Sequence, residues 1–160
     1  MLIIEGLVMC FVLLLICVVG IANGPVGLVI FYEQEVKERV IEMGLTTNGK
    51  IRRTWIITLI ALLVPQLVLP PVMVYCINGA EGFGDGFMQI LIILMISGLF
   101  DRFFIDWYWV GHTKAWLIPG TEDLMPYIHK KTWLVKIIGT VIAYPLFAAL
   151  ISWIFTVILK

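Results

Sequence analysis

The side chains with the clearest potential for chemistry lie in residues 97–116, SGLFDRFFIDWYWVGHTKAW. An α-helix turns by about 100° per residue, so Asp101, Tyr108 and His112 share one face, with His112 about 20° from Asp101. A carboxyl, a phenol and an imidazole in such a row can line a polar crevice or a proton path, and they are the candidate catalytic residues. Asp101 and His112 lie about 16 Å apart along the helix axis, which is too far for one metal ion, so no metal site is predicted.

The same stretch also has the features of a helix that leaves a membrane. Arg102 and Asp106 are four residues apart and can pair. Near Asp106 the helix reaches the polar boundary, so we expect Asp106, His112 and Lys114 to be solvated. Asp101 lies about one turn deeper, where an unpaired carboxylate costs about 2.5–3.5 kcal/mol, and we expect it to point inward toward a polar partner. Three tryptophans are typical of an interfacial aromatic belt: Trp107, Trp109 and Trp116.

Composition sets the fold class. Of the 160 residues, 61% are apolar and only 14% are charged, an excess that a globule of this size cannot bury. About 20 apolar residues suffice to cross a bilayer, and four segments qualify: about 7–32, 54–77, 87–107 and 133–159. The sequence therefore predicts an all-α polytopic membrane protein, one domain over residues 1–160, with four transmembrane helices in a bundle.

Basic residues predict the orientation of these helices. The loop 78–86 has none, and nine of the eleven basic residues fall in or beside the other two connections. Positively charged loops stay on the cytoplasmic side, so we expect a multi-pass protein of the cell membrane with both long loops cytoplasmic and both termini outside. The nine are Lys37, Arg39, Lys50, Arg52, Arg53, Lys114, Lys130, Lys131 and Lys136.

The two long connections have helical patterns of their own. We expect the first span to continue as a solvated charged helix that ends at Gly44, with Thr47 or Asn48 capping the next helix. The outline is that of a helix-turn-helix, but the second helix enters lipid directly after Arg53, so no nucleic-acid partner is predicted. The second connection is expected to form an interfacial segment before the fourth helix, with four residues on the membrane surface: Met125, Tyr127, Ile128 and Trp133.

Other spans supply polar groups beside prolines or at a depth similar to that of Asp101. The expected ligand- or ion-binding residues are Asp101 and Arg102 together with Asn23, Gln66, Thr140 and Tyr144, because polar side chains inside a membrane line sites or join helices. Asn23, Arg102, Thr140 and a carbonyl freed by Pro25 are the expected partners of Asp101. Four basic residues are the candidates for holding a lipid headgroup phosphate: Arg52, Arg53, Lys114 and Lys130.

Small residues and cysteines give two further expectations. Gly20, Gly24 and Gly27 on the first span, and Ala148 and Ser152 on the fourth, allow close helix approach, within the bundle or between protomers. The three cysteines are expected to be buried free thiols, with a Cys10–Cys76 disulfide as the alternative.

Three functions remain open on the sequence alone. The favoured one is a transport or permeation protomer that handles an ion or a small or lipidic ligand at the cytoplasmic end of the bundle. The alternatives are a membrane-embedded enzyme acting on a lipid or lipid-linked substrate, and an accessory subunit of a membrane complex. The expected partners are membrane lipid and either a second copy or a membrane-complex subunit. Because the sequence has no Walker-type, dinucleotide-binding, G-x-S-x-G or H-E-x-x-H motif, it identifies no cofactor.

Overall fold

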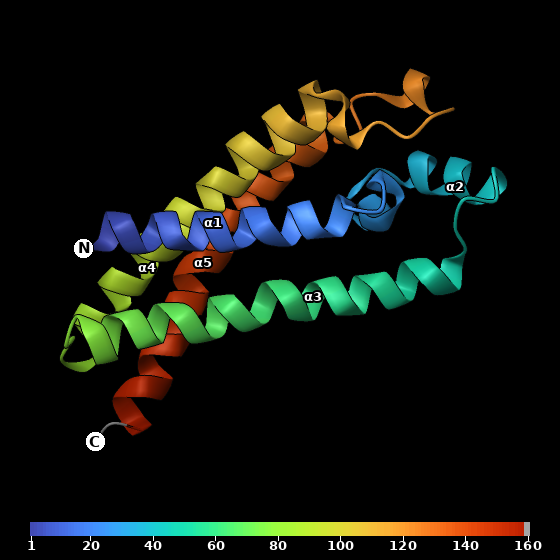
Figure 1. Cartoon of the computed structure of the whole chain (residues 1–160). Coiled ribbons are helices and arrows are strands. Elements are labelled where there is room, and N and C mark those ends of the chain that lie inside the picture. The colour runs from blue at the N-terminus through green and yellow to red at the C-terminus, as the bar shows by residue number, and fades with distance from the viewer. Residues whose placement is uncertain (159–160) are drawn as a thin grey trace.

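The computed structural model describes residues 1–158, and this part of the chain is helical with no strand. The main helices are α1 (Leu2–Ile21), α2 (Gln34–Glu42), α3 (Asn48–Pro71), α4 (Gly82–Phe100) and α5 (Lys130–Ile158) (Figure 1). Two π-helical segments, η2 (Val72–Ile77) and η3 (Asp101–Val110), continue α3 and α4 without a break. Three short 3-10 helices complete the chain: η1 (Pro25–Phe31), η4 (Lys114–Trp116) and η5 (Glu122–Leu124).

Four of these helices are long and apolar enough to cross a membrane. They are Leu2–Ile21, Asn48–Ile77, Gly82–Val110 and Lys130–Ile158. The last three contain the predicted spans and begin three to six residues earlier, because amphipathic or polar first turns extend each apolar run. The end of the fourth predicted span, Leu159, lies outside the described residues.

The first predicted span, 7–32, is wrong in its second half. The first long helix ends at Ile21, and Gly24 adopts φ 103°, a conformation that side chains with a Cβ rarely take. The backbone thus leaves the helix before Pro25, which begins the separate η1. Consequently α2 is a distinct helix and does not extend α1, although it ends near Gly44 and Thr47 caps α3, as the sequence predicts.

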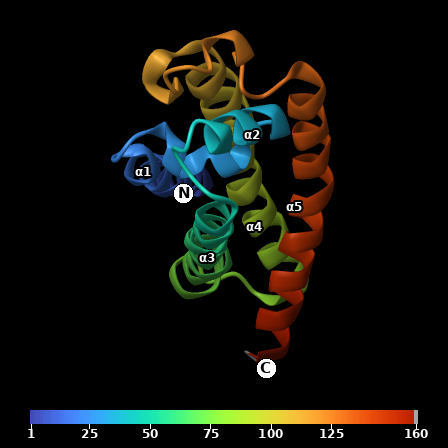
Figure 2. The same cartoon turned by 90° about the vertical axis from the view of Figure 1, so that its right-hand side faces the viewer.

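Close approach between α4 and α5 forms one of the two buried clusters. Ala148 and Ser152 on α5 are fully buried, in agreement with the prediction of a small-residue face within one chain. A Cβ on Gly98 of α4 would lie 2.3 Å from the Tyr144 ring, so this glycine leaves room for the side chain of Tyr144 on α5. In Figure 2 α4 runs between α5 on one side and α1 and α3 on the other.

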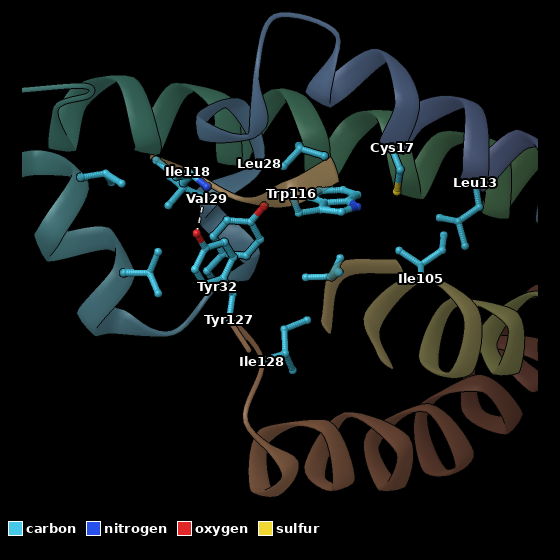
Figure 3. Close-up of a cluster of buried hydrophobic side chains, with 13 residues drawn as sticks. Leu13, Cys17, Leu28, Val29, Tyr32, Ile105, Trp116, Ile118, Tyr127 and Ile128 are labelled. Atoms are coloured by element: carbon cyan, nitrogen blue, oxygen red, sulfur yellow. Dashed lines mark hydrogen bonds between the residues drawn. The ribbon is translucent and has the colours of Figure 1, made fainter. Parts of the chain in front are cut away.

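The second buried cluster joins α2 to the connection that follows η3. Val36 and Val40 on α2 are fully buried, and Tyr127 and Ile128 of the connection pack into the same cluster (Figure 3). Tyr127 and Ile128 therefore lie in a protein core, which corrects the prediction that they lie on a membrane surface. An ion pair of 3.3 Å between Arg39 and Asp123 adds a polar contact at the rim.

Different segments of the chain lie at the two ends of the molecule. The N-terminus, the turn between η2 and α4 and the end of α5 lie at one end, and α2 and the segment 111–129 lie at the other (Figure 1). All three cysteines are free, so the alternative of a Cys10–Cys76 disulfide is wrong. Cys10 and Cys17 are buried as predicted, whereas Cys76 is exposed, which corrects the prediction of three buried thiols. The thiol of Cys10 instead approaches the carbonyl oxygen of Ile96 at 3.9 Å.

Candidate functional site

A partly open cavity of about 220 Å³ lies between α1, η1, α3, η3 and α5. Aliphatic side chains such as Leu13, Leu28 and Ile105 form part of its wall. Polar side chains gather along the rest of the wall, which makes it a mixed pocket of the kind that binds amphipathic ligands. The polar lining residues are Tyr32, Thr58, Gln66, Asp101, Arg102, Asp106, Trp116, Lys136 and Tyr144.

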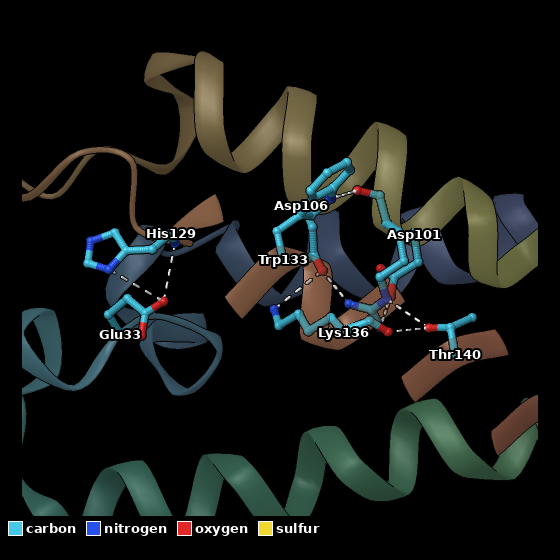
Figure 4. A network of polar contacts seen from close by, with 8 residues as sticks. Glu33, Asp101, Asp106, His129, Trp133, Lys136 and Thr140 are labelled. Carbon is cyan, nitrogen blue, oxygen red and sulfur yellow. Dashed lines mark hydrogen bonds and ion pairs between the residues drawn. The ribbon is translucent and has the colours of Figure 1, made fainter. Parts of the chain in front are cut away.

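A cluster of four charged residues occupies the η3 and α5 side of this cavity (Figure 4). The guanidinium of Arg102 lies 2.7 Å from the Asp101 carboxylate, pairs through Nη1 with Asp106, and donates from Nε to Thr140 Oγ1 at 3.1 Å. Lys136 Nζ lies 3.3 Å from the same Asp106 oxygen. The cluster therefore carries two acids and two bases, and it joins η3 to α5.

The π-helical segment η3 decides which side chains reach the cavity. In an i→i+5 pattern each turn holds more residues than in an α-helix, so the α-helical row of Asp101, Tyr108 and His112 does not form. Tyr108 is half exposed, and His112 is exposed with its Nδ1 bonded to the Trp107 carbonyl at 2.6 Å. The expectation of one working face with all three residues is wrong for this reason.

The predicted environment of Asp106 is also wrong. It is 6% exposed and held by both Arg102 and Lys136, whereas the sequence predicts a solvated carboxylate. Depth counted along the helix axis puts Asp106 near the boundary, but the π-helical segment turns it toward α5. The predicted pair of Arg102 and Asp106 is confirmed, and Asp101 contacts Arg102 as expected.

The remaining predicted binding residues divide into two groups. Gln66 and Tyr144 line the cavity, and Thr140 accepts from Arg102. Asn23 does not take part: it is exposed in the break between α1 and η1, so its predicted contact with Asp101 is wrong. A Cβ on Gly27 would lie 2.6 Å from the Gly20 carbonyl, so these glycines allow η1 to fold against α1.

Five polar residues of the cavity wall were not among the predicted binding residues: Tyr32, Thr58, Asp106, Trp116 and Lys136. Lys136 appears in the sequence among the loop lysines, although its place inside the apolar run of α5 is a signal of an inward role. Tyr32 directly follows η1 in the first connection, and Trp116 belongs to η4 in the second. Their rings meet edge to face, with ring centroids 6.3 Å apart. Burial raises the pKa of the Tyr32 phenol, with smaller contributions from Tyr127 and Cys17, so this group stays a protonated donor.

A second cavity of about 230 Å³ lies beside the first, between the end of η3 and the start of α5. His112 and Lys130 line it, and Asp106 lines both cavities. The other candidate headgroup residues lie elsewhere: Arg52 and Arg53 line a shallow hollow at the start of α3. The four basic candidates thus do not form one site.

Within residues 1–158 no three His, Cys, Asp or Glu side chains are grouped so that they could hold a metal ion. No protein-family model, curated protein or solved structure matches the chain.

Proposed function

We propose that the chain is an integral membrane protein whose four long helices form a bundle and take up a small or lipidic ligand in the cavity. In this proposal it is the binding protomer of a transport or permeation system. The supporting observation is the cavity itself, in which Asp101, Asp106 and Lys136 stand among aliphatic side chains. A charged cluster beside apolar side chains within the helices is expected where a membrane protein handles a polar group.

The proposed orientation follows from charge. Eight of the nine clustered basic residues belong to α2, the first two turns of α3, the segment 111–129 or the first turn of α5, and Lys136 lies in the second turn of α5. With that end in the cytoplasm, the charged cluster lies toward the cytoplasmic side and both termini lie outside. The ligand then reaches the cavity from the cytoplasm or from the inner leaflet.

The position of His112 favours ligand handling over catalysis. An enzyme using Asp101 and His112 needs both on one wall, but they line different cavities. Asp101 and Asp106 are both neutralised by Arg102 or Lys136, which suits binding better than proton abstraction. A purely structural subunit has no need of a 220 Å³ cavity beside its charged groups.

Native mass spectrometry of the protein extracted from its own membranes tests this proposal. Leu62 lines the cavity, and Leu62→Trp should fill the space and remove a bound mass that the wild type retains. Ile60 lies on the outer side of the same helix at 56% exposure, so Ile60→Trp is the matched control and should retain that mass. A wild type with no bound mass, or retention by both variants, would contradict the proposal.

A further inference from the structure

Two buried hydrogen-bond donors on the cavity wall have no partner within the described residues. They are the indole Nε1 of Trp116, whose side chain is 1% exposed, and the hydroxyl of Tyr32, at 3% exposure. Buried polar groups in folded proteins are nearly always satisfied, so two orphaned donors on one cavity wall indicate a molecule that accepts hydrogen bonds there. Figure 3 shows the indole nitrogen on the ring edge that faces Cys17 and Ile105, both of which line the cavity.

The surroundings hold these two donors in place. The Trp116 ring packs edge to face against Trp109 at 4.9 Å and against Tyr32 at 6.3 Å. The adjacent Tyr127 shows that the same core satisfies a phenol where it can, because its hydroxyl accepts from the backbone N–H of Ile118 at 2.9 Å and bonds to Thr121. Within this aromatic cluster, the Tyr127 hydroxyl therefore has protein partners, whereas the Tyr32 hydroxyl on the cavity side has none.

The charged cluster excludes an anionic headgroup. All three donor nitrogens of Arg102 are engaged, with Asp101, Asp106 and Thr140. A phosphate would have to displace a carboxylate to reach this guanidinium. Lys136 is paired with Asp106, and the two acids balance the two bases, so the cavity has no net charge to attract an anion or a cation.

The cavity offers two free donors and balanced charges, and apolar side chains such as Leu13, Leu28 and Ile105 form part of its wall. We infer that it binds an uncharged amphiphile through two carbonyl oxygens. The Trp116 nitrogen lies on the edge of the indole remote from the Tyr32 hydroxyl (Figure 3), so each donor serves a different carbonyl oxygen, and the apolar part of the ligand lies along the apolar side chains. This inference rests on the proposed function and narrows its ligand to one chemical class. Two sources share that chemistry: a glycerolipid without a phosphate, through its ester carbonyls, and a quinone, through its ring carbonyls.

Binding of three probes to the full chain in detergent tests the class. Dioctanoylglycerol and decylubiquinone are uncharged and carry ester and ketone carbonyls, respectively, and dioctanoyl phosphatidate is an anionic glycerolipid with the same acyl chains. We expect one of the neutral probes to bind with a lower Kd than phosphatidate, and the one that binds identifies the source. Tighter binding of phosphatidate overturns the inference but leaves the proposed function standing. Failure of every probe, together with no bound mass in the native protein, contradicts both.

Tyr32→Phe removes one donor and keeps its ring, and Trp116→Phe removes the other donor together with one ring of the indole. Trp116→Phe and Tyr32→Phe should each weaken binding of the neutral probe by roughly tenfold, the usual effect of losing one buried hydrogen bond. Trp153→Phe is the matched control, since Trp153 on α5 is 60% exposed and does not line the cavity, and it should leave the Kd unchanged. Unchanged affinity in both donor variants would show that ordered water, not a ligand, satisfies these groups.

Thermal unfolding provides a second readout that a structural role would not produce. Without ligand, Tyr32→Phe removes an unsatisfied buried hydroxyl and keeps the ring that fills the site, so its Tm should equal or exceed that of the wild type. With the neutral probe, the rise in Tm should be smaller than in the wild type. A variant with a lower Tm than the wild type without ligand, but with the same rise in Tm on adding the probe, would contradict a role of this donor in ligand binding.

Discussion

Lys136 Nζ lies 3.3 Å from the Asp106 carboxylate, and this contact joins α5 to the π-helical end of α4. Both side chains are largely buried, at 24% and 8% exposure. Asp106 also receives Arg102, so one carboxylate anchors two cations from two helices. The sequence predicts that Asp101 is the most important acidic residue, whereas in the structure Asp106 forms more ion pairs than Asp101.

Asp106→Asn should therefore destabilise the protein more than Asp101→Asn. Removing one partner of a buried charged pair costs about 3 kcal/mol, because the other charge is left uncompensated. Asp101 has one cationic partner and a side-chain exposure of 19%, so Asp101→Asn should lower the free energy of unfolding by only about 1.5 kcal/mol. Chemical denaturation in detergent measures both values.

A double-variant cycle checks that this loss comes from charge. Combining Asp106→Asn with Lys136→Met removes both members of the pair and should cost clearly less than the sum of the two single variants. Strict additivity would show that Lys136 and Asp106 do not interact energetically.

Gly27→Ala should disturb the fold of the first connection. A Cβ there would lie 2.6 Å from the backbone oxygen of Gly20, and a backbone atom cannot move aside as a side chain can. We expect a loss of about 1–3 kcal/mol in the free energy of unfolding. Gly139→Ala on α5 is the control: its Cβ meets nothing within 4 Å, and the greater helix propensity of alanine should stabilise by about 0.5–1 kcal/mol. Equal effects at both positions would contradict the close approach of η1 to α1.

Glu33 predicts a pH dependence of stability. Burial raises the pKa of its carboxyl, but hydrogen bonds with Thr132 and the His129 backbone, helped by the charges of His129 and Lys136, lower the pKa overall below 4.5. A folded-state pKa below the unfolded one means that the contribution is present above the unfolded pKa and is lost as the pH falls through the folded value. The Tm advantage of wild type over Glu33→Gln should therefore be full at neutral pH and be lost as the pH falls through the lowered folded-state pKa. A difference independent of pH would argue against this carboxylate.

Sidedness can be tested with cysteines placed at the two ends. In a Cys76→Ser background, which removes the exposed native thiol, a Gly84→Cys variant should react with an impermeant thiol reagent in intact cells. Asn48→Cys should react only after the cells are opened, because the basic end is expected to face the cytoplasm. Reversed labelling would invert the proposed orientation.

The parts of the fold that follow from local pattern were predictable. Long apolar runs give the four long helices, and the spacing of Arg102 and Asp106 gives their pair. The break after Ile21 was missed because a proline in an apolar run is equally typical of a kinked continuous helix, and only the positive φ of Gly24 decides between them. The positions of Tyr108 and His112 were missed because no residue pattern signals an i→i+5 turn. The aromatic cavity wall depends on contacts between two distant connections, which periodicity cannot reveal.

The π-helical segment also changes how the chain should tolerate deletions. A π turn contains one residue more than an α turn, so deleting the exposed Trp107 allows η3 to tighten toward an α-helix while the flanking segments keep their directions. Deleting Leu99, in the regular part of α4, has no such surplus to remove and rotates every later residue by about 100°. That rotation would carry Asp101, Arg102 and Asp106 away from α5 together. The surplus residues of η3 thus make the stretch beside the cavity the part of this helix where its length can change at least cost.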